Sequence, residues 1–147
     1  MLSKKQILII AIVITLVAVI GTQIWQSFDV SFAEVENTIR SFITALNIYD
    51  TDASWGLMSP TLQASYGTKE DFNAFLIGCS QGSWHVALTG ISTRSIETKD
   101  GITTARFIVT LQISEIGHGM TREDYTFKLV KIGDEWKIDD WRPGILD

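Results

Sequence analysis

The residues of this chain that could carry out acid–base or metal chemistry are few and widely spaced. Its two histidines are His85, which lies between Trp84 and Val86, and His118, which lies between two glycines. The only cysteine, Cys79, has no histidine or second cysteine at a spacing typical of a metal site. The sequence also lacks a glycine-rich nucleotide motif and a nucleophile elbow. These patterns predict no catalytic residue, no metal site and no cofactor.

A few side chains could nevertheless line a ligand pocket. The candidate pocket residues are Tyr49, Trp55, His85 and Tyr125. The simpler interpretation is that these aromatic residues pack in the core and that His85 is a structural residue at the start of a strand. Asp139 and Asp140 are adjacent, but neighbours on a strand point to opposite faces. We therefore do not expect them to form a carboxylate dyad.

An uncharged apolar run extends from Ile7 to Ile24. As a helix rising about 1.5 Å per residue, it can cross a hydrocarbon core of about 30 Å with modest thinning of the bilayer. Lys4 and Lys5 precede the run, and the first positive charge after it is Arg40. The positive-inside rule therefore predicts a cytoplasmic N-terminus, with the remainder of the chain outside. Trp25 lies where the helix would leave the bilayer, as an interfacial anchor does.

A cleaved signal peptide is an alternative interpretation of this run. Val19 and Gly21 are poor cleavage residues, while Ser31 and Ala33 lie too far downstream. We therefore expect a retained signal anchor, with residues 1–28 forming the cytoplasmic tip, the transmembrane segment and a short linker. Residues 29–147 would form one extracytoplasmic domain, and export after signal cleavage is the alternative localisation. A helix buried in a soluble protein fits less well, because no face of the run is polar.

The chain after the apolar run is acidic. It contains all 17 acidic residues and every basic residue except Lys4 and Lys5. Such a domain is unsuited to binding nucleic acid or anionic lipid head groups. It is long enough for a single core. A lone cysteine forms no disulfide within the chain, so we expect Cys79 to be a small buried hydrophobe, with intermolecular pairing as the alternative.

Helical spacing predicts three helices after the apolar run. The first covers 31–49 and begins at Ser31, with Glu34 three residues later in a capping-box pattern. A second, shorter helix covers 52–58, and Pro60 ends it or starts one further turn. Thr68 caps the third helix, which the glycines at 78 and 82 close.

After Trp84 the apolar pattern changes to period two, which predicts four strands over 86–96, 102–113, 121–131 and 135–141. Short turns join them into an antiparallel meander, and Gly90 predicts a bulge because the apolar parity changes there. The expected fold class is α+β: an N-terminal transmembrane helix, then three helices packed on a curved four-stranded antiparallel sheet. The expected core residues are Phe42, Leu46, Phe75, Phe107, Val109, Leu111, Phe127, Trp136 and Ile138.

Two segments and the order of the elements resemble the nuclear transport factor 2-like superfamily, which has a cystatin-like cone fold. Residues 49–60, YDTDASWGLMSP, are similar to a helix followed by the superfamily's Leu-x-Ser-Pro break. Residues 133–141, GDEWKIDDW, are similar to its last strand, where a Trp-Lys-Ile triplet follows a turn. The membrane-anchored, exported subset of this superfamily includes the inner-membrane assembly factor of type IV secretion systems and the juxtamembrane domain of some penicillin-binding proteins. The resemblance covers most of residues 31–141. Its membrane-anchored members imply a scaffold or assembly role for this chain.

These observations lead to two functional hypotheses. The first is a non-catalytic, membrane-tethered interaction or assembly module of the cell envelope. Its interaction face would contain Thr104, Ile108 and Thr110, which alternate with core residues, and would contact an envelope protein or a second copy of the chain. The alternative is a small-ligand-binding or weakly catalytic domain that uses the mouth of the cone. A filled cone would favour the first hypothesis, and a deep pocket with His85 or a carboxylate at its floor would favour the second.

Overall fold

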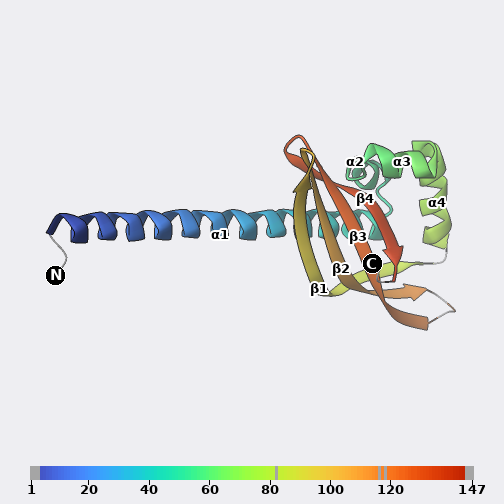
Figure 1. The fold of residues 1–147 in the computed structure, drawn as a ribbon. Coiled ribbons are helices and arrows are strands. Elements are labelled where there is room, and N and C mark those ends of the chain that lie inside the picture. The colour runs from blue at the N-terminus through green and yellow to red at the C-terminus, as the bar shows by residue number, and fades with distance from the viewer. Residues whose placement is uncertain (1–3, 82, 116, 118, 145–147) are drawn as a thin grey trace. The chain divides into compact units, whose positions relative to one another are not determined.

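The computed structural model describes residues 4–81, 83–115, 117 and 119–144, except for the side chains of 4–11 and 21–31. Contacts divide the chain into two compact units, residues 1–33 and 34–147, which we describe separately. In chain order, the elements are α1 (Lys4–Asn47), α2 (Thr51–Gly56), α3 (Pro60–Tyr66), α4 (Lys69–Gln81), β1 (His85–Lys99), β2 (Ile102–Glu115), β3 (Gly119–Ile132) and β4 (Glu135–Pro143) (Figure 1).

The helix expected to begin at Ser31 is instead part of α1, so the predicted capping box is wrong. Nothing between Thr22 and Asn47 stops a helix, because this stretch contains neither glycine nor proline. Within the residues whose side chains are described, no helix is both long and apolar enough to span a membrane. The run from Ile7 to Ile24 lies partly outside those residues, as do the side chains of the predicted interface residues Lys4, Lys5 and Trp25.

The second unit contains one more helix than the sequence predicted. The single turn expected after Pro60 is a separate helix, α3. The Ser59 hydroxyl caps it by accepting a hydrogen bond from the Leu62 N–H at 3.1 Å, and Pro60 occupies its first position. Gly67, at φ 93°, ends it in a backbone conformation that favours glycine. The Ser59 cap and Gly67 thus define the two ends of this seven-residue helix.

The sheet is the predicted antiparallel meander, with strand order β1-β2-β3-β4. Figure 1 shows its long strands curving across the domain. The predicted irregularity at Gly90 is confirmed, because the register of β1 against β2 shifts between Leu88 and Gly90. A second shift follows between Ile91 and Thr93. Such bulges increase the bend and twist of a strand, which lets the sheet wrap around a core.

The core lies between α1 and one face of the sheet, and most of the predicted core residues are fully buried. Phe42 of α1 packs edge-on against Phe127 of β3 and Trp141 of β4, with ring centroids 6.5 and 5.7 Å apart. The prediction that Phe75 is a core residue is wrong, since 42% of its surface is exposed. Phe72 and Leu76, one helical turn apart, take the inward face of α4 and leave Phe75 at its margin.

The segment between α2 and α3 extends the sheet beyond β4. The Ser59 N–H donates to the Ile138 carbonyl at 2.7 Å, and the Ile138 N–H donates to the Leu57 carbonyl at 2.8 Å. Beside this contact, the register of β3 and β4 shifts between Lys128 and Leu129. The shift leaves Asp139 without a directly opposite residue on β3, so the strict alternation assumed for Asp139 and Asp140 does not apply.

Candidate functional site

Aromatic side chains fill the space between the helices and the sheet. Around Phe72, which is fully buried, lie the rings of Trp55, Tyr66 and Phe75, with centroids 5.7, 4.9 and 6.0 Å away. The Tyr66 side chain interacts with that of Trp141, which links this cluster to the rings around Phe42. The interior of the cone is therefore occupied by its own side chains.

The polar groups next to this interior favour their neutral forms. Burial raises the pKa of Tyr66, and the interaction with Trp141 opposes the shift. Burial also raises the pKa of Tyr125, whose ring stacks on Trp141 at 5.9 Å, and the nearby Glu123 charge adds to the increase. The pKa of Cys79 is raised by burial and by the charge of Glu115. An activated phenolate or thiolate nucleophile would need a lowered pKa instead.

The four predicted pocket residues do not share one hollow among the five surface hollows described. Of the four, only Tyr49 lines any of these hollows, and its hydroxyl donates to the Trp84 carbonyl at 2.8 Å. Trp55 and Tyr125 belong to the two aromatic clusters above. His85 is exposed at the start of β1, and His118 lies outside the described residues. Among the described residues, no group of three histidine, cysteine or acidic side chains could hold a metal ion.

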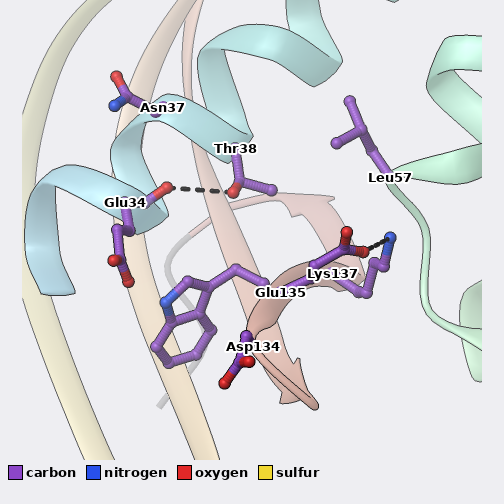
Figure 2. Close-up of a pocket in the computed structure, with 8 residues that line it drawn as sticks. Glu34, Asn37, Thr38, Leu57, Asp134, Glu135 and Lys137 are labelled. Atoms are coloured by element: carbon purple, nitrogen blue, oxygen red, sulfur yellow. Dashed lines mark hydrogen bonds and ion pairs between the residues drawn. The ribbon is translucent and has the colours of Figure 1, made fainter.

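A surface hollow of about 420 Å³ lies between α1 and the start of β4 (Figure 2). Figure 2 shows Glu34, Asn37 and Thr38 on the α1 side, with Asp134, Glu135 and Lys137 opposite. The Lys137 ammonium bridges the Glu135 carboxylate at 2.7 Å and the Gly56 carbonyl at 2.8 Å. The hydrogen bond and the positive charge of Lys137 lower the pKa of Glu135. The hollow is acidic, and its one lysine is already held by protein oxygens.

Trp136 forms part of this hollow and is 5% exposed. The Lys131 ammonium lies over its ring, 5.7 Å from the centroid, and 3.9 Å from the Glu34 carboxylate. The indole N–H is buried and has no hydrogen-bond partner. The lining of the hollow therefore includes three carboxylates and one lysine, with no histidine or cysteine among its residues.

The predicted interaction face is only partly open. Ile108 lies on the expected face, because Phe107 and Val109 beside it are in the core, but it is itself only 7% exposed. The expectation of an exposed Ile108 is wrong. Thr126, directly opposite on β3, is 1% exposed, so both sides of the sheet are covered at this level. Thr104 and Thr110 are half-buried, and the Thr110 hydroxyl donates to Asp124 at 2.7 Å.

Arg106 and Lys128 lie directly opposite each other on this face and were missed by sequence reasoning. The β2–β3 pairing is symmetric about Gly117, as Glu115 opposite Gly119 shows. The predicted strands, 102–113 and 121–131, have the same centre, but the sequence analysis did not pair their residues. Pairing the two predicted strands about that centre would have placed the two cations opposite each other.

No model of a known protein family matches the chain, and no curated protein matches its sequence. Solved structures do match its fold. A protein of unknown function from Mycobacterium tuberculosis is 11% identical with a TM-score of 0.57, and the match covers 82% of this chain and 76% of that one. A putative scytalone dehydratase from Novosphingobium aromaticivorans is 13% identical with a TM-score of 0.55, covering 82% and 88%.

A protein of unknown function from Shewanella oneidensis, described as NTF-2 like, is 14% identical with a TM-score of 0.55. The match covers 76% of this chain and 96% of that one. At such identities the likeness concerns the fold alone. It confirms the expected α+β fold, in which helices pack on a curved four-stranded antiparallel sheet.

Proposed function

We propose that the protein is a non-catalytic, membrane-tethered interaction or assembly module of the cell envelope. The observation that carries this proposal is the filled cone: Phe42, Phe72, Phe107 and Phe127 are all 0% exposed. In the described part of the domain, these aromatic rings occupy the space in which a substrate would otherwise be kept from water. The surface of the domain then becomes its functional part.

The membrane tether rests on the sequence. The run from Ile7 to Ile24 contains no charge, and Lys4 and Lys5 precede it. A helix of this composition is stable in a bilayer, where the backbone must satisfy its own hydrogen bonds. The positive-inside rule gives a cytoplasmic N-terminus, with residues 29–147 outside. The lipid bilayer is thus the first proposed partner, and Trp25 anchors the helix at the interface.

Accessibility to a membrane-impermeant maleimide tests this topology. In a Cys79→Ser background, a Lys99→Cys variant should be labelled in intact cells, because Lys99 is exposed at the end of β1. A matched Ser3→Cys variant should be labelled only after lysis. The reverse pattern would invert the topology, and release of the protein into the medium would show cleavage instead.

Photocrosslinking tests the interaction role separately. A photoreactive residue at Thr104 or Thr110 should give a discrete adduct in intact membranes, with another envelope protein or with a second copy of the chain. Asn73 on α4 is an exposed control position away from this face. Identical adducts from all three positions, or none from either threonine, would refute an interaction through this face.

The alternative function is ligand binding or weak catalysis at the mouth of the cone. It is favoured by Phe75, which is 42% exposed and contacts Tyr66 at 5.7 Å, so aromatic surface is accessible at the α3–α4 end. Two solved structures with this fold are described as putative dehydratases. Saturable quenching of tryptophan fluorescence by small aromatic compounds, lost in Phe75→Ala, would support this alternative over the interaction role.

A further inference from the structure

A second hollow, of about 310 Å³, lies on the sheet face that points away from the helices. It is lined by Glu97, Thr104, Ala105, Arg106, Lys128, Leu129 and Asp139. Thr104 and Arg106 alternate with the buried Phe107 along β2, so their side chains share the face opposite the aromatic core. No helical residue is part of this lining. The volume is at the small end of the range for ligand sites.

Two positive charges meet in this hollow. Arg106 and Lys128 are direct cross-strand partners, so they stand side by side on one face. Like charges at opposed positions destabilise a sheet unless an anion lies between them. The ion pairs of the described residues include neither side chain. The sheet therefore holds a pair of cations that no carboxylate of the described domain neutralises by direct contact.

Arg106 also carries an unsatisfied donor. Its Nε–H is buried and has no hydrogen-bond partner. A buried N–H without an acceptor costs about 1–3 kcal/mol, and native structures keep such groups few. The guanidinium fork of arginine matches the two oxygens of a carboxylate in a bidentate pair. An incoming carboxylate would supply both the missing acceptor and the missing negative charge.

The other side of the hollow is acidic. Glu97 and Asp139 line it, and the Ser59 hydroxyl holds one Asp139 oxygen by donating a hydrogen bond at 2.6 Å. Neither carboxylate is within ion-pair distance of Arg106 or Lys128. A phosphate would be repelled by these two carboxylates. A monocarboxylate that also bears a hydroxyl or ammonium donor matches both sides.

We propose that this hollow binds a small monocarboxylate that carries a hydrogen-bond donor, as hydroxy acids and amino acids do. Arg106 and Lys128 hold its carboxylate, the Thr104 hydroxyl donates to it, and Asp139 accepts from its donor group. This site goes beyond the proposed interaction role, because a carboxylate with a nearby donor group defines its ligand, whether or not that carboxylate belongs to a protein. The carboxylate could belong to a free acid or to the C-terminus of a partner chain.

Thermal unfolding of the full chain in mild detergent tests the site, with L-lactate and L-alanine as probes at constant ionic strength. A tenfold excess of probe over its dissociation constant should raise Tm by roughly 5 °C. The neutral analogue L-lactamide should have no effect. Arg106→Gln and Lys128→Gln should each abolish the shift, and the exposed Lys128 tolerates substitution if Arg106→Gln fails to fold.

Arg122→Gln is the matched control. Arg122 is an exposed cation on the same strand and the same face as Lys128, but it does not line the hollow. Its variant should keep the full Tm shift. An equal shift in all variants would mean a general ionic effect and would overturn the proposal, as would no saturable shift with either probe. A shift with phosphate but not with lactate would overturn the carboxylate assignment.

The source of the carboxylate is decided by comparing lactate with trialanine as its free acid and as its amide. Tighter binding of the free-acid peptide, lost in Lys128→Gln, would indicate a chain terminus as the ligand. Binding of lactate alone would indicate a free small acid. Both outcomes support the site, whereas equal binding of the peptide acid and the peptide amide refutes it. None of these results depends on the crosslinking at Thr104 or Thr110.

Discussion

The Asn47 side chain takes the place of a neighbouring strand beside Val86. Its Nδ2 donates to the Val86 carbonyl at 2.6 Å, and its Oδ1 accepts from the Val86 N–H at 2.8 Å. Asn47 is the last residue of α1, and Val86 is the second residue of β1, a strand at the edge of the sheet. One amide thus satisfies both backbone groups of a buried residue and joins the end of the helix to the sheet.

Asn47→Ala should therefore destabilise the domain by about 1–3 kcal/mol, since it leaves two backbone groups of Val86 without partners. Urea denaturation followed by tryptophan fluorescence measures the change in the free energy of unfolding. Asn37→Ala is the control, because Asn37 is exposed on the same helix. It should change stability by less than about 0.5 kcal/mol. Equal effects of the two variants would mean that the Asn47–Val86 contact contributes nothing.

Substitutions of Trp136 separate the ring from its unused N–H. Trp136→Ala should cost about 3–5 kcal/mol, because Trp136 is 5% exposed and its removal leaves a cavity. Trp136→Phe should cost much less, since it keeps an aromatic ring and removes a buried N–H that has no partner. Urea denaturation of the two variants checks this order. A phenylalanine variant as unstable as the alanine variant would show that the indole N–H is in fact bonded.

Ile108→Lys should destabilise the domain by several kcal/mol, because it places an ammonium group at a position that is 7% exposed. Ile102→Lys provides a control on the same strand, where the side chain is 57% exposed. That substitution should leave the unfolding midpoint nearly unchanged. Comparable midpoints for the two variants would show that Ile108 is accessible after all, as the sequence alone suggested.

The start of α4 should lose stability in acid. The Asp71 carboxylate accepts hydrogen bonds from the Thr68 N–H at 2.9 Å and the Thr68 hydroxyl at 2.7 Å. These bonds lower the pKa of Asp71 in the folded state. A depressed folded-state pKa gives stability that is complete above the unfolded-state pKa and is lost as the pH falls through the folded-state value.

A comparison with Asp71→Asn tests this contribution through the pH dependence of Tm. The variant should lie below the parent at neutral pH, and the difference should shrink in acid once Asp71 of the parent is protonated. A gap between the two proteins that stays constant from neutral to acidic pH would contradict the linkage. Glu70→Gln, with an exposed carboxylate in the same first turn, is the matched control.

Cys79 should react slowly for a cysteine. Burial and the charge of Glu115 raise the pKa of its thiol, so less thiolate is present at pH 8 than for a free cysteine. Alkylation by iodoacetamide should be slower in the folded protein than in urea. Glu115→Gln should accelerate the folded-state reaction by lowering that pKa. A rate in the folded state equal to that in urea would mean that Cys79 is neither shielded nor affected by Glu115.

Hydrophobic periodicity predicted much of this domain. The alternation along 102–113 assigned Phe107 and Val109 to the core, and the Thr68 cap and the Gly90 bulge are where the sequence placed them. These features depend on residues close together in the chain, so local rules are sufficient to find them. The apolar run from Ile7 to Ile24 is likewise a property of the sequence itself, and the membrane tether inferred from it remains a prediction.

Only the tertiary structure decided what covers each face and which distant groups meet. The period-two alternation placed Ile108 on the sheet face opposite the core. It could not show that Ile108 is buried on that face too, since burial depends on the curvature of the whole sheet. The pairing of Arg106 with Lys128 depends on loop length, because a shift of one residue in the loop changes every cross-strand partner. The contact of Asn47 with Val86 joins residues 39 positions apart. No local pattern encodes such a contact, because it forms only when helix and sheet pack together.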